Sequence, residues 1–215
     1  MSGSAVAGVV PAAGRSARMG SPKALMKIGD GTFLSRVCGA LTRAGCAPVV
    51  VVVRHLQDPT AAEARRLGAR VVKNFDPEEG PISSIRVALA HLQATSDPAL
   101  LGLLLHPVDH PMVRSETIGE ILRAFHRSRP LLAVPTVGDT TGHPVLFSRT
   151  LFQELETPDL PEGARAVVRR HRKGTLHVPV DDPGILADID TPEEYERHLG
   201  SQARIDQRGG RRGHG

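Results

Sequence analysis

Residues 5–23, AVAGVVPAAGRSARMGSPK, lead from a short apolar segment into a loop of small and basic residues. The segment 5–10 contains only Ala, Val and Gly, as expected of a buried β-strand, and the loop follows it at once. Small residues let a backbone approach a ligand closely, and exposed amides at a turn leading into a helix attract phosphate. Arg15, Arg18 and Lys23 add positive charge that could oppose a triphosphate. The stretch therefore predicts a phosphate-binding loop after the first strand of an α/β fold.

The loop does not match the common phosphate-binding motifs. Five residues separate Gly14 from Gly20, and no Gly-Lys-Ser or Gly-Lys-Thr follows, so it is not a Walker loop. It also lacks the Gly-x-Gly-x-x-Gly fingerprint of dinucleotide-binding proteins. On composition alone, a flexible surface loop with solvated arginines is the alternative interpretation.

Strands and helices are predicted to alternate through the first 135 residues. Continuous apolar, β-branched runs predict buried strands, and apolar residues three and four apart predict helices. Strands are expected near 5–10, 48–53, 70–73, 100–105 and 131–135, with helices around 33–41, before residue 68, and at 82–92 and 118–125. Thr32 and Ser115 are expected to cap the first and last of these helices. This order predicts a three-layer α/β/α sandwich with a mostly parallel, Rossmann-like central sheet, which binds ligands beyond the C-terminal ends of its strands.

The pattern after residue 135 is less regular. Further strands are expected at 144–147 and near 175–178, and a helix is expected around 164–168. Thr191-Pro-Glu-Glu194 predicts one more helix start, with a cap, a Pro at the first position and a capping-box Glu. No internal repeat or linker is evident before residue 200, so residues 1–200 are expected to form a single domain.

Composition and charge narrow the class of protein. Of 215 residues, 40% are hydrophobic and 23% charged, as in globular domains, but only 3% are aromatic, which argues against base-stacking surfaces for single-stranded nucleic acid. Residues 201–215 carry four arginines and one aspartate, which is +3 of the formal net charge of +4. We expect this polar segment to be a disordered basic tail, and nucleic acid not to be a partner.

The sequence shows neither a targeting segment nor a disulfide pattern typical of secreted proteins. No apolar segment resembles a signal peptide or approaches membrane-spanning length. Cys38 and Cys46 are the only cysteines, and two sparse cysteines are expected to be free thiols. We therefore expect a cytoplasmic protein with no membrane partner.

The loop sequence Ala-Ala-Gly-Arg-Ser-Ala-Arg-Met-Gly-Ser-Pro-Lys resembles the signature loop of the nucleotide-diphospho-sugar-transferase-like nucleotidyltransferases. Within them it is most similar to the molybdenum cofactor nucleotidyltransferase group. The resemblance implies that the loop wraps a nucleoside triphosphate and that Arg18 and Lys23 are the catalytic basic pair. The nucleotide-binding residues that it implies in this loop are Ala12, Ala13, Gly14, Arg15 and Ser16.

Two acidic segments are candidates for a metal site. Asp109 ends a buried strand, where its carboxylate could hold Mg²⁺ or merely turn the chain. Asp188 and Asp190 alternate in an extended segment and could face one site, or could belong to a solvated helix cap. The first segment resembles the family's Gly-Asp-x-Pro motif, and the second its closing Asp-Ile-Asp-Thr-Pro-Glu motif. The resemblance implies that Asp109 is catalytic and binds Mg²⁺ together with Asp190, which is preferred over Asp188.

A zinc site is the alternative for His106, Asp109 and His110. Pro107 and Pro111 interrupt any helix here, so the three side chains need not converge. The family often has Gly where this chain has His106.

Three further segments resemble the family, so that the resemblance covers residues 5–199. Gly80-Pro-Ile-Ser-Ser-Ile-Arg86 is similar to the segment that contacts base and ribose, which implies that Gly80, Pro81 and Ser84 bind nucleotide. Thr141-Gly-His-Pro is similar to the strand on the acceptor side, which implies roles there for Gly142 and His143, with Asp188; the family usually has Arg in place of Thr141. Gly163-Ala-Arg165 matches a later Gly-Ala-Arg segment.

The resemblance implies that an acceptor phosphate attacks the α-phosphorus of a nucleoside triphosphate and that pyrophosphate leaves. Ala13, Gly142-His-Pro and Asp188-Ile-Asp190 resemble the molybdenum cofactor cytidylyltransferases more than the guanylyltransferases. CTP is therefore favoured as the nucleotide, with GTP next, and molybdopterin cofactor as the phosphorylated acceptor. The alternatives are a sugar-phosphate or methylerythritol-phosphate nucleotidyltransferase, suggested by the opening Val10-Pro-Ala-Ala-Gly14, and a non-catalytic nucleotide-binding regulatory protein.

Overall fold

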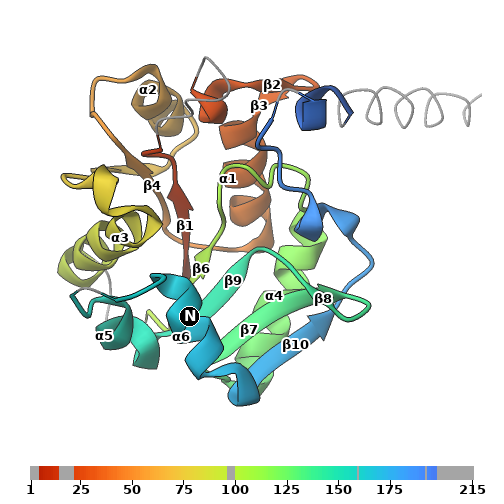
Figure 1. Ribbon diagram of the computed structural model, residues 1–215. Coiled ribbons are helices and arrows are strands. Elements are labelled where there is room, and N and C mark those ends of the chain that lie inside the picture. The colour runs from red at the N-terminus through yellow and green to blue at the C-terminus, as the bar shows by residue number, and fades with distance from the viewer. Residues whose placement is uncertain (1–4, 15–21, 96–99, 159, 192, 198–215) are drawn as a thin grey trace, which may run out of the picture.

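A mixed sheet of eight strands crosses the centre of the molecule, with helices on both of its faces (Figure 1). The computed structural model describes residues 5–14, 22–95, 100–158, 160–191 and 193–197. The strands run in the order β10-β7-β9-β6-β1-β4-β5, and β8 pairs with β7. Their bounds are Val6–Pro11 for β1, Val49–Val53 for β4, Arg70–Lys73 for β5, Gly102–Leu105 for β6, Leu132–Val137 for β7, Thr140–Thr141 for β8, Val145–Ser148 for β9 and Thr175–Pro179 for β10.

Most neighbouring strands of this sheet are parallel. Strand β1 pairs in parallel with β4 and β6, β4 with β5, and β7 with β10. Strand β9 is antiparallel to both of its neighbours, β6 and β7, and the short β8 is antiparallel to β7. The predicted mostly parallel sheet is confirmed, and the C-terminal ends of β1, β4 and β6 lie along one edge.

Helices α1 to α6 form the two outer layers in the described part of the chain. Helices α1 (Phe33–Ala44), α2 (Pro59–Arg66) and α4 (Ser115–Ser128) pack on one face, and α3 (Pro81–Thr95), α5 (Phe152–Leu155) and α6 (Ala164–Arg170) pack on the other. The valines of β4 alternate between these layers: Val49, Val51 and Val53 contact the first core, and Val50 and Val52 contact the second. The predicted three-layer sandwich is therefore confirmed.

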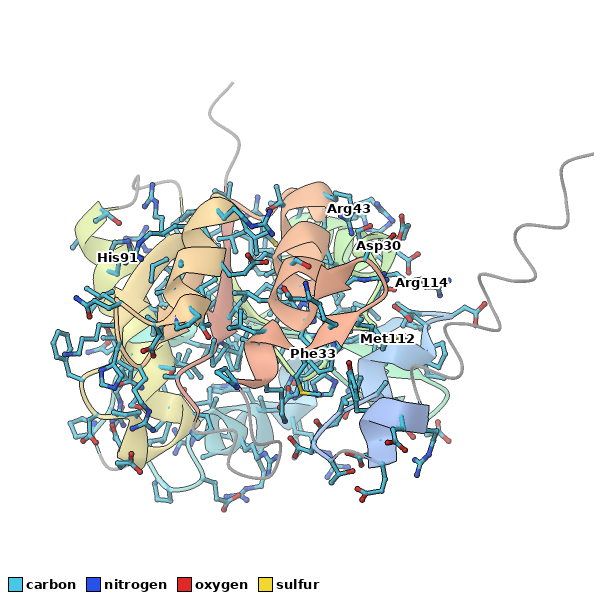
Figure 2. The ribbon with its side chains drawn as sticks, turned by 90° about the horizontal axis from the view of Figure 1, so that it is seen from above. Asp30, Phe33, Arg43, His91, Met112 and Arg114 are labelled. Atoms are coloured by element: carbon cyan, nitrogen blue, oxygen red, sulfur yellow. The ribbon has the colours of Figure 1, made fainter. Side chains whose placement is uncertain are left out.

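Helices α1 and α2 lie side by side over their face of the sheet (Figure 2). A short hairpin of β2 (Lys27–Ile28) and β3 (Gly31–Thr32) leads into α1. Thr32 caps α1 as predicted, because its side chain accepts a hydrogen bond from the Ser35 amide, and Gly45 ends the helix with a φ of +98°. Phe33, at the start of α1, is fully buried, and its ring centroid lies 6.0 Å from that of Tyr195.

The prediction that Ser115 caps α4 is wrong. Ser115 is the first helical residue, and the cap position is held by Arg114. The Arg114 amide donates to Asp182 Oδ2 at 2.9 Å, and the Thr117 hydroxyl donates to the same oxygen at 2.6 Å. A carboxylate from much later in the chain thus replaces the local cap, which local sequence could not reveal.

The sequence also predicted free cysteines, no membrane-spanning segment and a disordered tail. Cys38 and Cys46 are buried free thiols, and burial raises the pKa of each to about 12. None of the helices in the described part of the chain is both long and apolar enough to cross a bilayer. The tail predicted at 201–215 lies outside the described residues.

Candidate functional site

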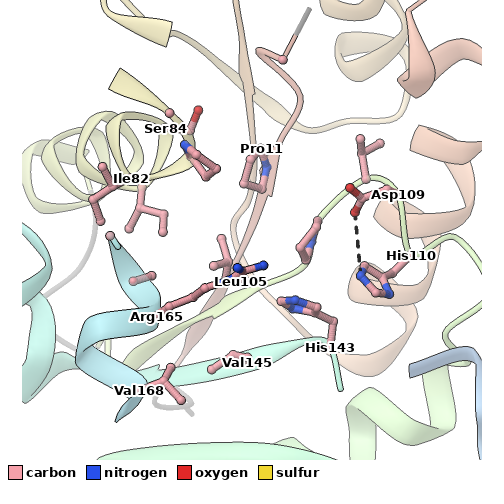
Figure 3. A pocket seen from close by; sticks show the side chains of 18 of the residues that line it. Pro11, Ile82, Ser84, Leu105, Asp109, His110, His143, Val145, Arg165 and Val168 are labelled. Atoms are coloured by element: carbon pink, nitrogen blue, oxygen red, sulfur yellow. Dashed lines mark ion pairs between the residues drawn. The ribbon is translucent and has the colours of Figure 1, made fainter. Parts of the chain in front are cut away.

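A cleft of about 1690 Å³ opens beside the C-terminal ends of the central strands (Figure 3). Its walls come from five parts of the chain: the end of β1 with the glycine loop, the start of α3, the segment after β6, the loop before β9, and α6. The acidic segment 188–190 closes one side. The sheet rule placed ligands at this edge, and nearly all of the described residues proposed for the site line this one cleft.

The glycine loop lies at the cleft wall as far as the structure describes it. Ala12, Ala13 and Gly14 line the cleft. The Ala12 amide continues the sheet by donating to the Val52 carbonyl at 2.8 Å. The predicted residues Arg15, Ser16 and Arg18 lie outside the described residues.

Arg54, after β4, supports the start of this loop. Its Nε donates to the Ala13 carbonyl at 3.3 Å, and its guanidinium pairs with Glu78 at 2.9 Å. Sequence reasoning missed Arg54, because a lone arginine after a strand carries no motif. It acts on the site by positioning the loop backbone.

Lys23 lies between two of the predicted metal ligands. Its ammonium forms an ion pair with Asp190, and its Nζ lies 3.8 Å from Asp109 Oδ2. The Lys23 side chain is only 12% exposed, so these charges interact with limited screening by water. The structure thus brings the predicted site residues Lys23, Asp109 and Asp190 together in the cleft.

Asp109, His110 and Asp188 form the metal-type cluster among the described residues. One ligand atom from each lies within 4.8 Å of those of the other two. Burial raises the pKa of Asp109 above its ordinary value despite the Lys23 ammonium, and burial together with Asp109 and Asp190 raises the pKa of Asp188 to about 6. Excess negative charge at one place is the electrostatic condition that favours a cation.

The donor set fits a divalent cation. Asp109 Oδ1 is buried and receives no hydrogen bond from the part of the chain that the structure describes. A buried carboxylate oxygen without a partner is costly unless something else neutralises it. The structure groups Asp188 rather than Asp190 with Asp109, so the preference for Asp190 stays a prediction.

The zinc alternative does not fit this cluster, because His106 is not part of it. The His106 ring is fully buried, and its Nε2 lies 3.1 Å from the carbonyl oxygen of His110. His106 therefore holds the turn that carries Asp109 and His110.

The acidic segment is held at both ends. Ile189 is fully buried, and its amide donates to the Asp109 carbonyl at 3.0 Å, which leaves Asp188 and Asp190 on the cleft side. Glu194 accepts hydrogen bonds from the amides of Asp190 and Thr191 at 2.8 and 2.9 Å, and its own amide donates to the Thr191 hydroxyl. The capping box predicted at Thr191 is therefore confirmed.

Gly142 and His143 bring the segment before β9 to the same place. The His143 amide donates to the Ile185 carbonyl at 3.0 Å, and its ring lies against that of His110, with centroids 4.6 Å apart (Figure 3). A Cβ added at Gly142 would lie 2.3 Å from the Ile185 carbonyl oxygen. Glycine is required here because the two backbones touch.

Gly142→Ala is expected to push away the segment that carries Asp188. The clash is with backbone and cannot be relieved by a rotamer change, so we expect the free energy of unfolding to fall by about 1–3 kcal/mol. Displacement of the acidic segment should also lower turnover by roughly tenfold. Chemical denaturation and steady-state kinetics measure the two effects. Gly174→Ala is the matched control, since a Cβ there meets no atom within 4 Å; equal behaviour of the two variants would contradict the close-approach argument.

The predicted base-side residues Gly80, Pro81 and Ser84 line the opposite wall. Asn74, directly after β5, organises this wall: its Nδ2 donates to the hydroxyls of Ser83 and Ser84 at 2.8 and 3.1 Å. Its side-chain oxygen accepts from the Asp76 amide at 3.0 Å. Asn74 is 2% exposed and was missed, because an isolated Asn after a strand reads as a turn residue.

Asn74→Ala is expected to leave several of these buried groups without partners. We expect the free energy of unfolding to fall by about 1–3 kcal/mol and the KM for the nucleotide to rise. Denaturation and a nucleotide titration measure these changes. Asp76→Ala, an exposed neighbour, should stay within about 0.5 kcal/mol of the wild type. An Asn74 variant as stable as Asp76→Ala would refute the role of the network.

The far end of the cleft is basic. Arg165, Arg169 and Arg172, on α6 and the turn after it, all line it. Arg169 pairs with Glu162 at 2.6 Å. The Arg165 side chain extends along the cleft near Leu105 (Figure 3), and its charge helps to lower the pKa of His143. Three guanidinium groups at this end favour an anionic ligand.

Comparison with known proteins assigns the fold to a family. The model of the MobA-like NTP transferase domain matches residues 8–175, which include the glycine loop, the segment around Asp109 and the start of β10. The chain belongs to this family. It is therefore a nucleotidyltransferase, and the predicted resemblance is confirmed.

Named relatives cover most of the chain. It is 27% identical over 206 residues, 90% of this chain and 95% of the relative, to a probable molybdenum cofactor guanylyltransferase of Opitutus terrae. It is 29% identical over 202 residues, 88% of each chain, to the molybdenum cofactor guanylyltransferase of Rhizobium meliloti. It is also 29% identical over 196 residues, 86% of each chain, to the 2-C-methyl-D-erythritol 4-phosphate cytidylyltransferase of Saccharopolyspora erythraea.

A solved structure from Mycobacterium tuberculosis shares the fold. It is 31% identical, with a TM-score of 0.77, and the match covers 93% of this chain and all of that one. The same protein has been solved in complex with manganese, and that structure matches with a TM-score of 0.71 at 29% identity, covering 92% of this chain and 99% of that one.

Proposed function

We propose that this chain transfers a nucleoside monophosphate from GTP to a phosphorylated acceptor, the molybdopterin cofactor, and releases pyrophosphate. The observation that carries the proposal is one cleft that joins the glycine loop, Lys23, the cluster of Asp109 and Asp188, and a basic far end. A nucleotide and a second anionic substrate could lie end to end in it.

The reaction needs no covalent intermediate on the protein. An oxygen of the acceptor phosphate attacks the α-phosphorus, the bond from that phosphorus to the β-bridging oxygen breaks, and pyrophosphate carries away the charge. Catalysis in such a transfer comes from positioning and from neutralising charge. A divalent cation held at Asp109 and the acidic segment would supply charge neutralisation at the α-phosphate.

The chain's own residues would divide the remaining work. Lys23, released from Asp190, would contact the phosphates of the nucleotide, together with Arg18 of the glycine loop. Gly80 and Ser84 would contact the base and ribose. Arg165, which reaches along the acceptor side of the cleft, would bind the acceptor phosphate in place of the Arg that the resemblance led us to expect at Thr141.

The nucleotide preference differs from the one that the sequence favoured. Ala13 and Gly142-His-Pro pointed to CTP, but two named relatives that cover most of the chain are guanylyltransferases. The cytidylyl interpretation is therefore not favoured, and GTP is the proposed substrate. Ala13 is buried at 3% exposure, so its side chain offers a base little surface to recognise.

The test is pyrophosphate release on mixing the protein with a divalent cation, molybdopterin and each nucleotide in turn. We expect release with GTP at least tenfold faster than with CTP, a discrimination that requires about 1.4 kcal/mol. No release with GTP, CTP, ATP or UTP would refute transfer to molybdopterin. Faster release with CTP would refute the guanylyl assignment alone.

A sugar-phosphate acceptor is the second candidate, because one relative of similar identity is a 2-C-methyl-D-erythritol 4-phosphate cytidylyltransferase. Replacing molybdopterin by methylerythritol phosphate in the same assay, with CTP, separates the two. Release with methylerythritol phosphate and CTP, and none with molybdopterin and GTP, would establish this candidate instead.

A further inference from the structure

His110 is a second type of donor in the cluster with Asp109 and Asp188. Its ligand nitrogen and the two carboxylate oxygens lie within 4.8 Å of one another, a spacing that one cation could bridge. His110 Nε2 is 3.9 Å from Asp109 Oδ1, and Figure 3 shows the ring directed at that carboxylate. The two residues are adjacent in sequence, and the turn held by His106 presents both to one place.

The His110 ring is built into the site. The residue is 7% exposed, and Nδ1 finds no hydrogen-bond partner among the described residues. The His143 ring packs against it with centroids 4.6 Å apart, which restricts its orientation. The nitrogen of an uncharged imidazole offers a lone pair to a cation. His110 Nε2 is the nitrogen that faces Asp109 Oδ1. That oxygen is buried and accepts no hydrogen bond from the described residues, which is costly unless a ligand binds it.

Asp190 is not part of this cluster, and its carboxylate contacts the Lys23 ammonium more closely than Asp109 Oδ2 does at 3.8 Å. The cation site that the geometry offers therefore has two oxygen donors and one nitrogen donor. Mg²⁺ prefers oxygen ligands and keeps its waters, whereas imidazole suits transition ions such as Mn²⁺, Co²⁺ and Zn²⁺.

We propose that His110 supplies a nitrogen ligand to a cation bound between Asp109 and Asp188, so that this site prefers a transition-metal ion such as Mn²⁺ over Mg²⁺. Only the role of this cation in nucleotidyl transfer rests on the proposed function. Binding itself requires neither nucleotide nor acceptor. The sequence suggested a Mg²⁺ site with carboxylate oxygen ligands only. The proposed site has one nitrogen ligand in addition and therefore suits a softer ion.

The direct test uses the full chain, free of nucleotide, loaded with Mn²⁺. Pulsed electron paramagnetic resonance should detect coupling of Mn²⁺ to a directly bound nitrogen, and incorporation of ¹⁵N-histidine should change that coupling to the ¹⁵N pattern. His110→Gln should lose it, whereas His126→Gln, an exposed histidine of α4 outside the cleft, should retain it. The wild-type measurement needs no variant, so a misfolded His110 variant would not remove the test.

Calorimetry supplies the second measurement. We expect the ratio of Mn²⁺ to Mg²⁺ affinity to fall on the order of tenfold in His110→Gln, which corresponds to about 1.4 kcal/mol, and to change little in His126→Gln. Wild-type Mn²⁺ without histidine nitrogen coupling would overturn the proposal, as would an unchanged affinity ratio in His110→Gln. Neither result would affect pyrophosphate release, which tests the proposed function separately. If nitrogen coupling is observed but pyrophosphate is never released, the metal site is supported and the proposed function is refuted.

Discussion

Asp109→Asn is expected to lower nucleotide turnover by about two to three orders of magnitude while leaving the fold intact. Asp109 has a buried oxygen that accepts no hydrogen bond from the described residues, lies 3.8 Å from Lys23 and belongs to the metal-type cluster. An amide keeps the shape of the side chain but removes the charge that a cation needs. Nucleotide binding through the glycine loop should persist, so the loss should appear in kcat more than in KM.

Pyrophosphate release and calorimetric nucleotide binding measure the two parts of this prediction. Asp139→Asn, an exposed aspartate in the turn between β7 and β8 and away from the cleft, is the matched control and should behave as wild type. An Asp109→Asn enzyme with wild-type turnover would remove the centre of the proposed mechanism.

Double variants identify the partner of Asp109. Residues that hold one ion act as a unit, so removing both should cost scarcely more than removing one. We expect this for Asp109→Asn with Asp188→Asn, because these two residues share a cluster. If the losses of turnover multiply for Asp109 and Asp188 but do not for Asp109 and Asp190, Asp190 is the second metal ligand, as the sequence favoured.

The fold could be predicted well from local patterns. The five valines 49–53 can only be a strand buried on both faces, and Thr32 and Gly45 mark the two ends of α1 by side-chain and backbone chemistry. Strand β9 could not be oriented in this way. Its antiparallel pairing with β6 and β7 depends on residues distant in the sequence. The apolar run Val-Leu-Phe predicts a strand but does not indicate whether that strand is parallel or antiparallel to its neighbours.

The site could be predicted in part, through motifs. Among the described residues that recognisable segments carry, Lys23, Asp109, Gly142 and Asp190 line the cleft. Supporting residues were missed, because their side chains carry no motif: Arg54 holds the Ala13 carbonyl, Asn74 holds Ser83 and Ser84, and Asp182 caps the start of α4. His110 was considered only with His106 for zinc, because adjacent residues give no hint of which rings face a shared centre and which face the core.

Lys23→Ala is expected to have opposite effects on turnover and on cation binding. The Lys23 ammonium pairs with Asp190 and lies 3.8 Å from Asp109 Oδ2, so it neutralises the acidic side of the cleft when no nucleotide is bound. Its removal takes one positive charge from the phosphates of the bound nucleotide, and turnover should fall by about two orders of magnitude. The same removal ends a repulsion between the ammonium and a divalent cation at Asp109.

We therefore expect Lys23→Ala to bind Mn²⁺ more tightly than wild type by roughly tenfold in the absence of nucleotide. Two unit charges about 4 Å apart interact by about 1 kcal/mol even in bulk water, and the cation carries two charges. Calorimetry with Mn²⁺ and pyrophosphate release measure the two effects on the same preparations. Lys27→Ala, an exposed lysine outside the cleft, should change neither. Weaker cation binding in Lys23→Ala would mean that Lys23 orders the carboxylates instead of competing for them, whereas unchanged turnover would separate Lys23 from the phosphates altogether.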